Sequence, residues 1–224
     1  MEKLSNRSDC WYKDVCHSDD VDCNMCVRFE EMSHLMETSN LPKSKQKPIP
    51  LNAPKCDLQA YKRLGEIKSN IEDFVRSGGN LYITSHTAGN GKTSWAVKLL
   101  LKYFDIIWAG NGFNTRGIFI HVPTFLMKCK DFKTTDPEFE KLRKQLFDVD
   151  LVVWDDIAST SLSGYDYSQL LVYIDSRTFA EKANIYTGNC ETRELLEEKL
   201  GNKMASRIWG NGTEIITFKG GDKR

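Results

Sequence analysis

The chain has 224 residues, enough for one ordinary domain and a small additional module. Hydrophobic residues make up 40% and charged residues 28%, which is typical of a globular protein with a substantial core. Lys and Arg total 31, as do Asp and Glu, so a globally basic protein is excluded and any nucleic-acid-binding surface must be a local patch. No apolar run approaches the roughly 20 residues of a membrane span. The N-terminal sequence M-E-K-L-S-N-R-S-D lacks the apolar core of a signal peptide, which predicts a cytoplasmic protein.

Four of the seven cysteines lie near the N-terminus, at Cys10, Cys16, Cys23 and Cys26. In a reducing compartment such a cluster holds a metal more often than disulfides. The C-x-x-C pair is a good zinc-knuckle signal, whereas the five residues between the first two cysteines are a less standard spacing. We expect the four thiolates to bind one tetrahedral Zn²⁺. The alternatives are that His17 replaces one cysteine, or that all four thiols are free.

The composition then changes twice along the chain. We predict a Cys-rich zinc-binding module over residues 1–40, a Pro/Lys-rich linker over 41–56, and one globular domain over 57–224. A module of this size has too little core to fold alone, and a metal would supply the missing stability. Apolar residues at helical spacing end the module, and this stripe is expected to pack on the cysteines or to bind a partner. It consists of Phe29, Met32, Leu35 and Met36.

From about residue 57, helices and apolar strands alternate. The predicted strands cover 81–84, 117–122, 151–154, 184–187 and 214–218. The predicted helices cover 94–104, 124–129, 168–180 and 193–200, the last with Thr192 as N-cap and Gly201 beyond its end. Two more helical stripes contain Ile67, Ile71, Phe74 and Val75, ended by Gly78-Gly79, and Phe139, Leu142 and Leu146. This alternation predicts an α/β fold, a parallel sheet with helices on both faces.

The first predicted strand runs into the sequence T-S-H-T-A-G-N-G-K-T, residues 84–93, and a helix follows. This is the strand–loop–helix arrangement of a phosphate-binding loop. Lys92 would reach the β- and γ-phosphates, and the Thr93 hydroxyl would ligate Mg²⁺. Glycines in the loop allow the backbone to approach phosphate oxygens closely. The predicted nucleotide-binding residues are Ala88, Gly89, Asn90, Gly91, Lys92, Thr93 and Ser94.

His86 stands where the pattern G-x-x-x-x-G-K-T has its first glycine. One interpretation is a degenerate loop that does not hydrolyse ATP. The residues nearest the phosphates are intact, however, so we expect a nucleotide site. The tripeptide G-N-G also occurs at 110–112 and 210–212, where no Lys-Thr follows, and there it predicts turns.

Two acids follow the apolar strand L-V-V-W, at Asp155 and Asp156. Taken alone, the pair would more often mark a strand that leads into a helix cap. In phosphate-loop proteins, however, an acid at the end of a neighbouring strand holds the Mg²⁺. We therefore expect Asp155 to bind Mg²⁺ with Thr93, and Asp156 to polarise the attacking water.

Over roughly residues 60–224 the sequence resembles the DnaC/DnaI-type AAA+ ATPases that load replicative helicases, with the transposition helper IstB as a close relative. The resemblance rests on the two motifs above, on Y-T-G-N at 186–189, on K-M-A-S-R-I at 203–208 and on the ending F-K-G-G-D-K-R. It implies that Asn189 is the sensor that orients the attacking water. It also implies that Arg207 is an arginine finger for the γ-phosphate of a neighbouring subunit, with an ordinary surface arginine as the alternative.

Three further positions bear on the resemblance. Arg177 lies where similar proteins often carry another arginine. His86 replaces glycine, and Gly188 stands where relatives often have serine. These departures put the rate of hydrolysis in doubt more than the fold. The remaining cysteines, Cys56, Cys129 and Cys190, are expected to be ordinary core or surface residues.

The resemblance implies an AAA+ domain without a helical lid and a helicase-loading function. The zinc module would dock on a hexameric DnaB-type helicase, while the ATPase domain would assemble head to tail, bind ATP with Mg²⁺ and engage single-stranded DNA. The short chain suggests a phage or mobile-element version. An IstB-like transposition helper is one alternative, but those proteins lack a cysteine-zinc unit of this form. A nucleotide-binding adaptor with weak or no hydrolysis is another. A small-molecule kinase fits least, because it gives Asn189 and Arg207 no task.

Overall fold

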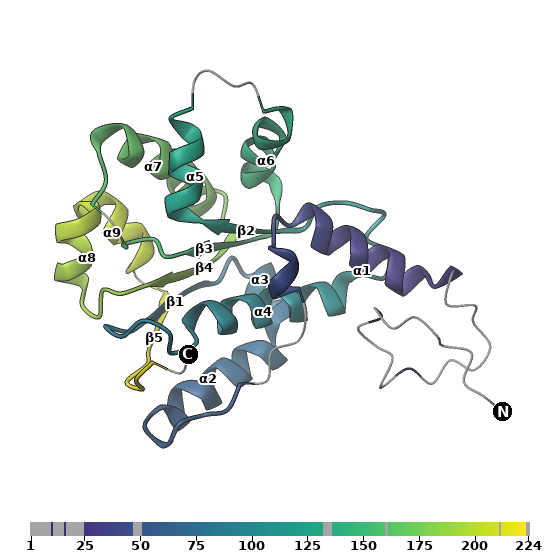
Figure 1. The fold of residues 1–224 in the computed structure, drawn as a ribbon, viewed down its shortest axis with the longest axis horizontal. Coiled ribbons are helices and arrows are strands. Elements are labelled where there is room, and N and C mark those ends of the chain that lie inside the picture. The colour runs from purple at the N-terminus through teal and green to yellow at the C-terminus, as the bar shows by residue number, and fades with distance from the viewer. Residues whose placement is uncertain are drawn as a thin grey trace.

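The computed structural model describes residues 10, 16, 25–46, 51–131, 136–159, 161–210 and 212–222. Its centre is one sheet of five parallel strands in the order β2-β3-β4-β1-β5 (Figure 1). All five predicted strands are confirmed to within one residue at each end. They are β1 (Asn80–Thr84), β2 (Gly117–His121), β3 (Leu151–Asp155), β4 (Ala183–Gly188) and β5 (Thr213–Thr217).

Helices cover both faces of the sheet, because alternate residues of each buried strand are apolar on both sides. On one face, Leu151 and Val153 pack with α2 (Leu58–Ser69), α3 (Ile71–Arg76) and α4 (Lys92–Ile107). On the other, Val152 and Trp154 pack with a second set of helices. These are α5 (Val122–Cys129), α6 (Pro137–Asp148), α7 (Gly164–Phe179), α8 (Arg193–Leu200) and α9 (Asn202–Ile208). The predicted α/β architecture is therefore confirmed.

Local sequence explains where the helices depart from the predicted ranges. The stripe through Ile67 and Val75 forms two helices rather than one, because Asn70 has non-helical φ and ψ of −114° and 29° and separates α2 from α3. α7 begins four residues before the predicted start, since Ser163 and Asp166 form a capping box. α9 was not predicted and follows α8 directly after Gly201. The Thr192 cap of α8 is confirmed, with its side chain accepting a hydrogen bond from the Leu195 amide.

The apolar stripe near the N-terminus belongs to the α/β core. It lies on α1 (Val27–Thr38), and Met32, Leu35 and Met36 pack in the same cluster as the α4 side chains. The expectation that this stripe packs on the cysteines or binds a partner was therefore wrong. α4 and the sheet offer the stripe a larger apolar surface than a small cysteine module does, so its burial there is more favourable.

The segment after α1 covers the edge of the sheet at β2. The Ser39 carbonyl accepts a hydrogen bond from the Phe119 amide at 2.7 Å, and the Asn40 side chain donates to the Phe119 carbonyl at 2.9 Å. Leu41 is buried in the core, and the short 3-10 helix η2 (Lys43–Lys45) follows. The first part of the predicted linker is thus attached to the domain. Its hydrogen bonds also pair part of the backbone of β2, which is an edge strand of the sheet.

The C-terminal F-K-G-G sequence is attached as well. Phe218 is fully buried, and the Asp57 carboxylate accepts hydrogen bonds from the Lys219 and Gly220 amides. Asp57 ends the 3-10 helix η3 (Lys55–Asp57). The segment that precedes α2 therefore contacts the segment that follows β5. Within the described part of the chain, no helix is both long and apolar enough to cross a membrane.

Candidate nucleotide site

A cavity of about 360 Å³ lies at the carboxyl ends of β1, β3 and β4. Ligands of open α/β sheets bind at this edge, where loops connect strands to helices. The cavity is lined by Lys45, Ala88, Gly89, Asn90, Gly91, Lys92, Thr93, Ser94, Asp156, Ser159 and Asn189. The structure thus brings together all seven predicted loop residues with Asp156 and Asn189. Sequence reasoning missed Lys45 and Ser159.

The loop has the backbone geometry that close approach to phosphate requires. Gly89 and Gly91 have φ of 73° and 101°, in the left-handed region that glycine adopts readily. α4 begins at Lys92, so the amides of its first turn lie at the cavity. The Lys92 ammonium donates hydrogen bonds to the Thr87 carbonyl at 2.9 Å and to Asn90 Oδ1 at 3.3 Å.

The predicted Mg²⁺ ligands are in direct contact. Thr93 Oγ1 donates a hydrogen bond of 2.7 Å to Asp155 Oδ1, and Thr187 Oγ1 donates one of 2.7 Å to the same oxygen. Asp155 is buried, and this burial raises the pKa of its carboxyl, while the two hydroxyl hydrogen bonds oppose the shift. The hydroxyl and the carboxylate are hard oxygen donors, which Mg²⁺ prefers, so these residues fit the ion.

His121 is a neighbour of the acidic pair that the sequence did not single out. It ends β2 opposite Asp155 in the parallel register, and its Nε2 lies 3.6 Å from Asp156 Oδ2. One ligand atom from each of His121, Asp155 and Asp156 falls within a span of 4.8 Å. The sequence could have indicated His121 through its position at the end of a predicted strand, because adjacent parallel strands end at the same edge of a sheet.

The end of β4 is fixed to the end of β3 through Thr187. Its hydroxyl accepts from the Asp156 amide at 3.0 Å, and its carbonyl accepts from the Ile157 amide at 2.9 Å. These bonds hold Asp156, which has φ of 59°, beside Asn189 at the cavity. Gly188 precedes Asn189, and a Cβ there would lie 2.5 Å from Tyr82 Oη. The tyrosine therefore explains why glycine occupies a position where relatives often have serine.

His86 lies at the entry to the loop and is held by Glu191. The His86 amide and its Nδ1 each lie 3.1 Å from Glu191 Oε1. Hydrogen bonding by His86 lowers the pKa of the Glu191 carboxyl. The imidazole does not line the cavity. His86 does not have a positive φ, so its position in the loop does not require glycine.

The two arginines differ in environment. Arg207 lies on α9, outside the cavity, and its Nε donates a hydrogen bond of 2.7 Å to Asp175 Oδ1 on α7. Lys203 contacts the same carboxylate at 3.3 Å. Hydrogen bonding by Arg207, with smaller effects from Lys203, lowers the pKa of Asp175. The structure does not bring Arg207 to the nucleotide cavity of its own chain.

Arg177, by contrast, is enclosed in the core between α7 and the start of β4. It is fully buried and donates hydrogen bonds to Asn184 Oδ1 and to four backbone carbonyls. Those carbonyls belong to Leu146, Val149, Asp150 and Ala183. Burial lowers the pKa of its guanidinium to about 10.

The sequence matches no family model and no curated protein. Solved structures do match. The crystal structure of the DnaC helicase loader is 20% identical with a TM-score of 0.61, covering 76% of this chain and 94% of that chain. The crystal structure of DnaI is 16% identical with a TM-score of 0.62, covering 84% of this chain and 100% of that chain. The chain has the fold of the DnaC and DnaI structures.

Two further structures share this fold. A putative primosome component from Streptococcus pyogenes serotype M3 is 19% identical with a TM-score of 0.60, covering 86% of this chain and 98% of that chain. Replication initiator DnaA bound to AMPPCP and single-stranded DNA is 17% identical with a TM-score of 0.57 and 75% of this chain covered. The match spans 48% of that DnaA chain, about half its length.

The cysteines preceding the DnaC/DnaI-like fold are only partly described. Within the described part of the chain, Cys10, Cys16 and Cys26 form no disulfide and are half-buried, whereas Cys23 and His17 lie outside the described residues. The zinc site therefore stays a prediction. Cys129 and Cys190 are buried and Cys56 is exposed, as expected for ordinary core and surface residues.

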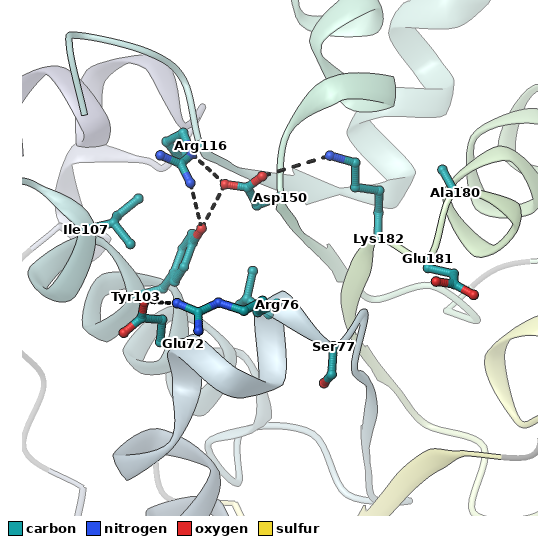
Figure 2. Close-up of a pocket in the computed structure, with 11 residues that line it drawn as sticks. Glu72, Arg76, Ser77, Tyr103, Ile107, Arg116, Asp150, Ala180, Glu181 and Lys182 are labelled. Carbon is teal, nitrogen blue, oxygen red and sulfur yellow. Dashed lines mark hydrogen bonds and ion pairs between the residues drawn. The ribbon is translucent and has the colours of Figure 1, made fainter. Parts of the chain in front are cut away.

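A second cavity, of about 510 Å³, lies at the opposite edge of the DnaC/DnaI-like sheet (Figure 2). Asp150, just before β3, accepts hydrogen bonds there from Tyr103 Oη and Arg116 Nε. Its other oxygen lies 3.9 Å from the Lys182 ammonium, and Arg76 pairs with Glu72. Each lining cation thus faces a carboxylate, so its charge is neutralised within the protein.

Proposed function

We propose that this protein is an ATP-dependent helicase loader, which binds a DnaB-type replicative helicase and places it on single-stranded DNA during replication initiation. The observation that carries the proposal is the Thr93–Asp155 contact beside a cavity lined by the G-N-G-K-T loop. It occurs in the fold of the DnaC and DnaI structures. Glycine backbone, lysine, threonine and a buried acid together form a site for Mg²⁺-ATP.

Each residue has a defined task in ATP hydrolysis. The α4 amides and Lys92 bind the phosphates, and Thr93 with Asp155 would hold Mg²⁺, which neutralises charge on the phosphate oxygens when bound. Asp156 accepts the proton of the attacking water, and Asn189 orients that water. Arg207 acts on the nucleotide of a neighbouring subunit, which agrees with its place outside its own cavity.

The partners follow from the same proposal. The Zn²⁺ module of Cys10, Cys16, Cys23 and Cys26 docks on the helicase, and the ATPase domains assemble head to tail. The similarity to the DnaC helicase loader supports the helicase as partner, and the similarity to DnaA bound to single-stranded DNA supports that ligand. His86 was the only feature in favour of a non-hydrolysing adaptor, and it does not line the cavity. We therefore favour hydrolysis.

Nucleotide binding is tested with the full chain and Lys92→Ala. Loss of the charge-assisted hydrogen bonds should weaken Mg²⁺-ATP binding by about 10- to 100-fold. Lys182→Ala, in the second cavity, is the matched control and should leave affinity unchanged. Equal affinity of the wild type and Lys92→Ala would contradict the site assignment.

Loading is tested by mixing the protein with the host's replicative helicase and forked DNA coated with single-strand-binding protein. Wild type should bind the helicase and stimulate unwinding. Cys23→Ser/Cys26→Ser should fail to bind it, whereas Cys56→Ser should behave as wild type. If wild type binds ATP but not the helicase, the protein is an ATPase with another partner and the loader proposal fails.

A further inference from the structure

Lys45 lines the nucleotide cavity although it lies outside every predicted nucleotide motif. It is the last residue of η2, in the segment that joins α1 to the α/β domain. The same cavity is lined by Lys92, Asp156 and Asn189. Lys45 therefore supplies a positive charge near the ends of β3 and β4, although its segment precedes β1 in the chain.

The segment that carries Lys45 is fixed on the domain. Ser39 and Asn40 bind the Phe119 backbone on β2, and Leu41 is only 4% exposed. The Gln46 side chain donates a hydrogen bond of 3.0 Å to the Leu41 carbonyl, which closes the turn around η2. The position of Lys45 at the cavity is thus built by several contacts on either side of it.

The ammonium of Lys45 is available to an anion. Its Nζ lies 5.9 Å from the centroid of the Phe119 ring, within the range of a cation–π contact. Among the described residues, no carboxylate or carbonyl is recorded as its hydrogen-bond or ion-pair partner. Lys92 differs, because its ammonium is bound to Thr87 and Asn90 of the loop.

We propose that Lys45 is a second phosphate-binding lysine of the site, and that it contacts the terminal phosphate of a bound nucleoside triphosphate. The inference rests on the proposed ATP site and adds a ligand contact to it. Lys45 lines the same cavity as Asp156 and Asn189, the residues assigned to the attacking water. It lies over Phe119 of β2, the strand next to β3, and we therefore place it beside the terminal phosphate. A compact ammonium suits this task as a point charge.

The contact would make affinity depend on the terminal phosphate. A nucleoside triphosphate engages Lys45, whereas a diphosphate lacks the group that reaches it. Lys45→Gln should therefore weaken binding of a non-hydrolysable ATP analogue by about 10-fold or more, as expected for loss of a charge-assisted hydrogen bond. ADP affinity should change by less than about 3-fold, a difference under 1 kcal/mol.

The experiment measures the affinity of the full chain for the ATP analogue and for ADP, both with Mg²⁺, in four proteins. They are wild type, Lys45→Gln, Lys45→Arg and Lys43→Gln, the last being an exposed lysine of the same short helix that does not line the cavity. Lys45→Arg should retain most of the difference in affinity between the ATP analogue and ADP, and Lys43→Gln should retain all of it. Thermal unfolding of each variant checks that the fold is intact.

The outcomes separate this inference from the proposed function. If wild type binds neither nucleotide, or if Lys92→Ala binds as wild type does, the ATP site itself is wrong and the Lys45 proposal falls with it. If binding depends on Lys92 but Lys45→Gln leaves both affinities unchanged, or weakens both equally, the Lys45 proposal alone is overturned. Selective loss of triphosphate affinity in Lys45→Gln supports it.

Discussion

Thr93 Oγ1 lies 2.7 Å from Asp155 Oδ1, so the first turn of α4 and the end of β3 are joined by one hydrogen bond across 62 positions of sequence. Asp155 also accepts from Thr187 on β4. A single carboxylate oxygen thus connects three elements of the sheet edge at the nucleotide cavity. If this carboxylate is replaced by an amide, its contribution to stability and its contribution to ATP hydrolysis can be measured separately.

Asp155→Asn should lower Mg²⁺-dependent ATP hydrolysis by at least about 10- to 100-fold, because even a change to a hydrogen-bond partner of a metal ligand costs that much and Asp155 itself would hold the ion. An amide oxygen can still accept both threonine hydrogen bonds, so the variant should fold. Burial raises the pKa of Asp155, which means that its ionised form destabilises the fold at pH 7. The thermal midpoint of the variant should therefore equal or exceed that of wild type.

Calorimetry and a phosphate-release assay measure both quantities. Asp148→Asn, at the exposed end of α6, is the control and should change neither. Full ATPase activity in Asp155→Asn would show that this carboxylate does not hold the ion.

A mixing experiment tests whether Arg207 acts between subunits. Arg207→Ala should bind ATP as wild type does, because the arginine lines no part of its own cavity, but should hydrolyse it about 10³-fold more slowly. Lys92→Ala should be inactive for lack of nucleotide. A mixture of the two should regain activity, since an intact loop in one chain meets an intact Arg207 from the other.

The phosphate-release rate is measured as the two inactive proteins are titrated together. Absence of recovery, with both variants folded and associating with wild type, would mean that Arg207 has no role in a neighbouring site. Arg193→Ala, on the exposed surface of α8, is the matched control and should leave the rate of wild type unchanged.

Arg177→Ala should destabilise the protein by about 3 kcal/mol or more. The substitution removes five hydrogen bonds from the core, although Asn184 Oδ1 keeps the one from Trp154 Nε1 and the Asp150 carbonyl keeps the one from the Ala183 amide. Buried acceptors that lose a donor are costly. Urea denaturation measures the free energy of unfolding. Arg76→Ala, which removes an exposed ion pair with Glu72, should cost less than about 1 kcal/mol. A similar cost for both variants would contradict the structural role of Arg177.

The stability that Glu191 contributes should depend on pH. Hydrogen bonding by His86 lowers the pKa of Glu191 below its ordinary value of 4.5, so the folded state favours the ionised carboxylate. The contribution is present above pH 4.5 and is lost as the pH falls through the lowered pKa. The thermal midpoint of wild type should exceed that of Glu191→Gln at pH 6, and the difference should shrink below pH 4. A constant difference across this range would contradict the pairing.

Thiol alkylation distinguishes the three cysteines of the α/β domain. Burial raises the pKa of Cys129 and of Cys190, so both thiols stay protonated and covered near neutral pH. Cys56, which is exposed, should react with iodoacetamide in the native protein, whereas the other two should react only after unfolding. Mass spectrometry of the digested protein reads out each site. Rapid labelling of Cys190 would indicate that the end of β4 opens readily.

The sequence determined the strands and the phosphate loop by itself, because their signals are local. Short runs of two to four residues, rich in β-branched, aromatic and other apolar side chains, predict strands wherever these strands pair. The sequence G-N-G-K-T between a strand and a helix carries its own backbone requirements. The ends of α8 were likewise set by Thr192 and Gly201, whose effects act within a few residues.

The tertiary structure decided which distant residues meet. Parallel register placed His121 beside Asp155 and Asp156, and the packing of α1 on α4 brought Lys45 to the cavity from a segment that reads as a linker. Arg177 and Arg207 are both arginines near helix ends in the sequence, yet one is enclosed by carbonyls and the other pairs with Asp175 at the surface. Such differences depend on contacts between elements far apart in the chain, which no local pattern encodes.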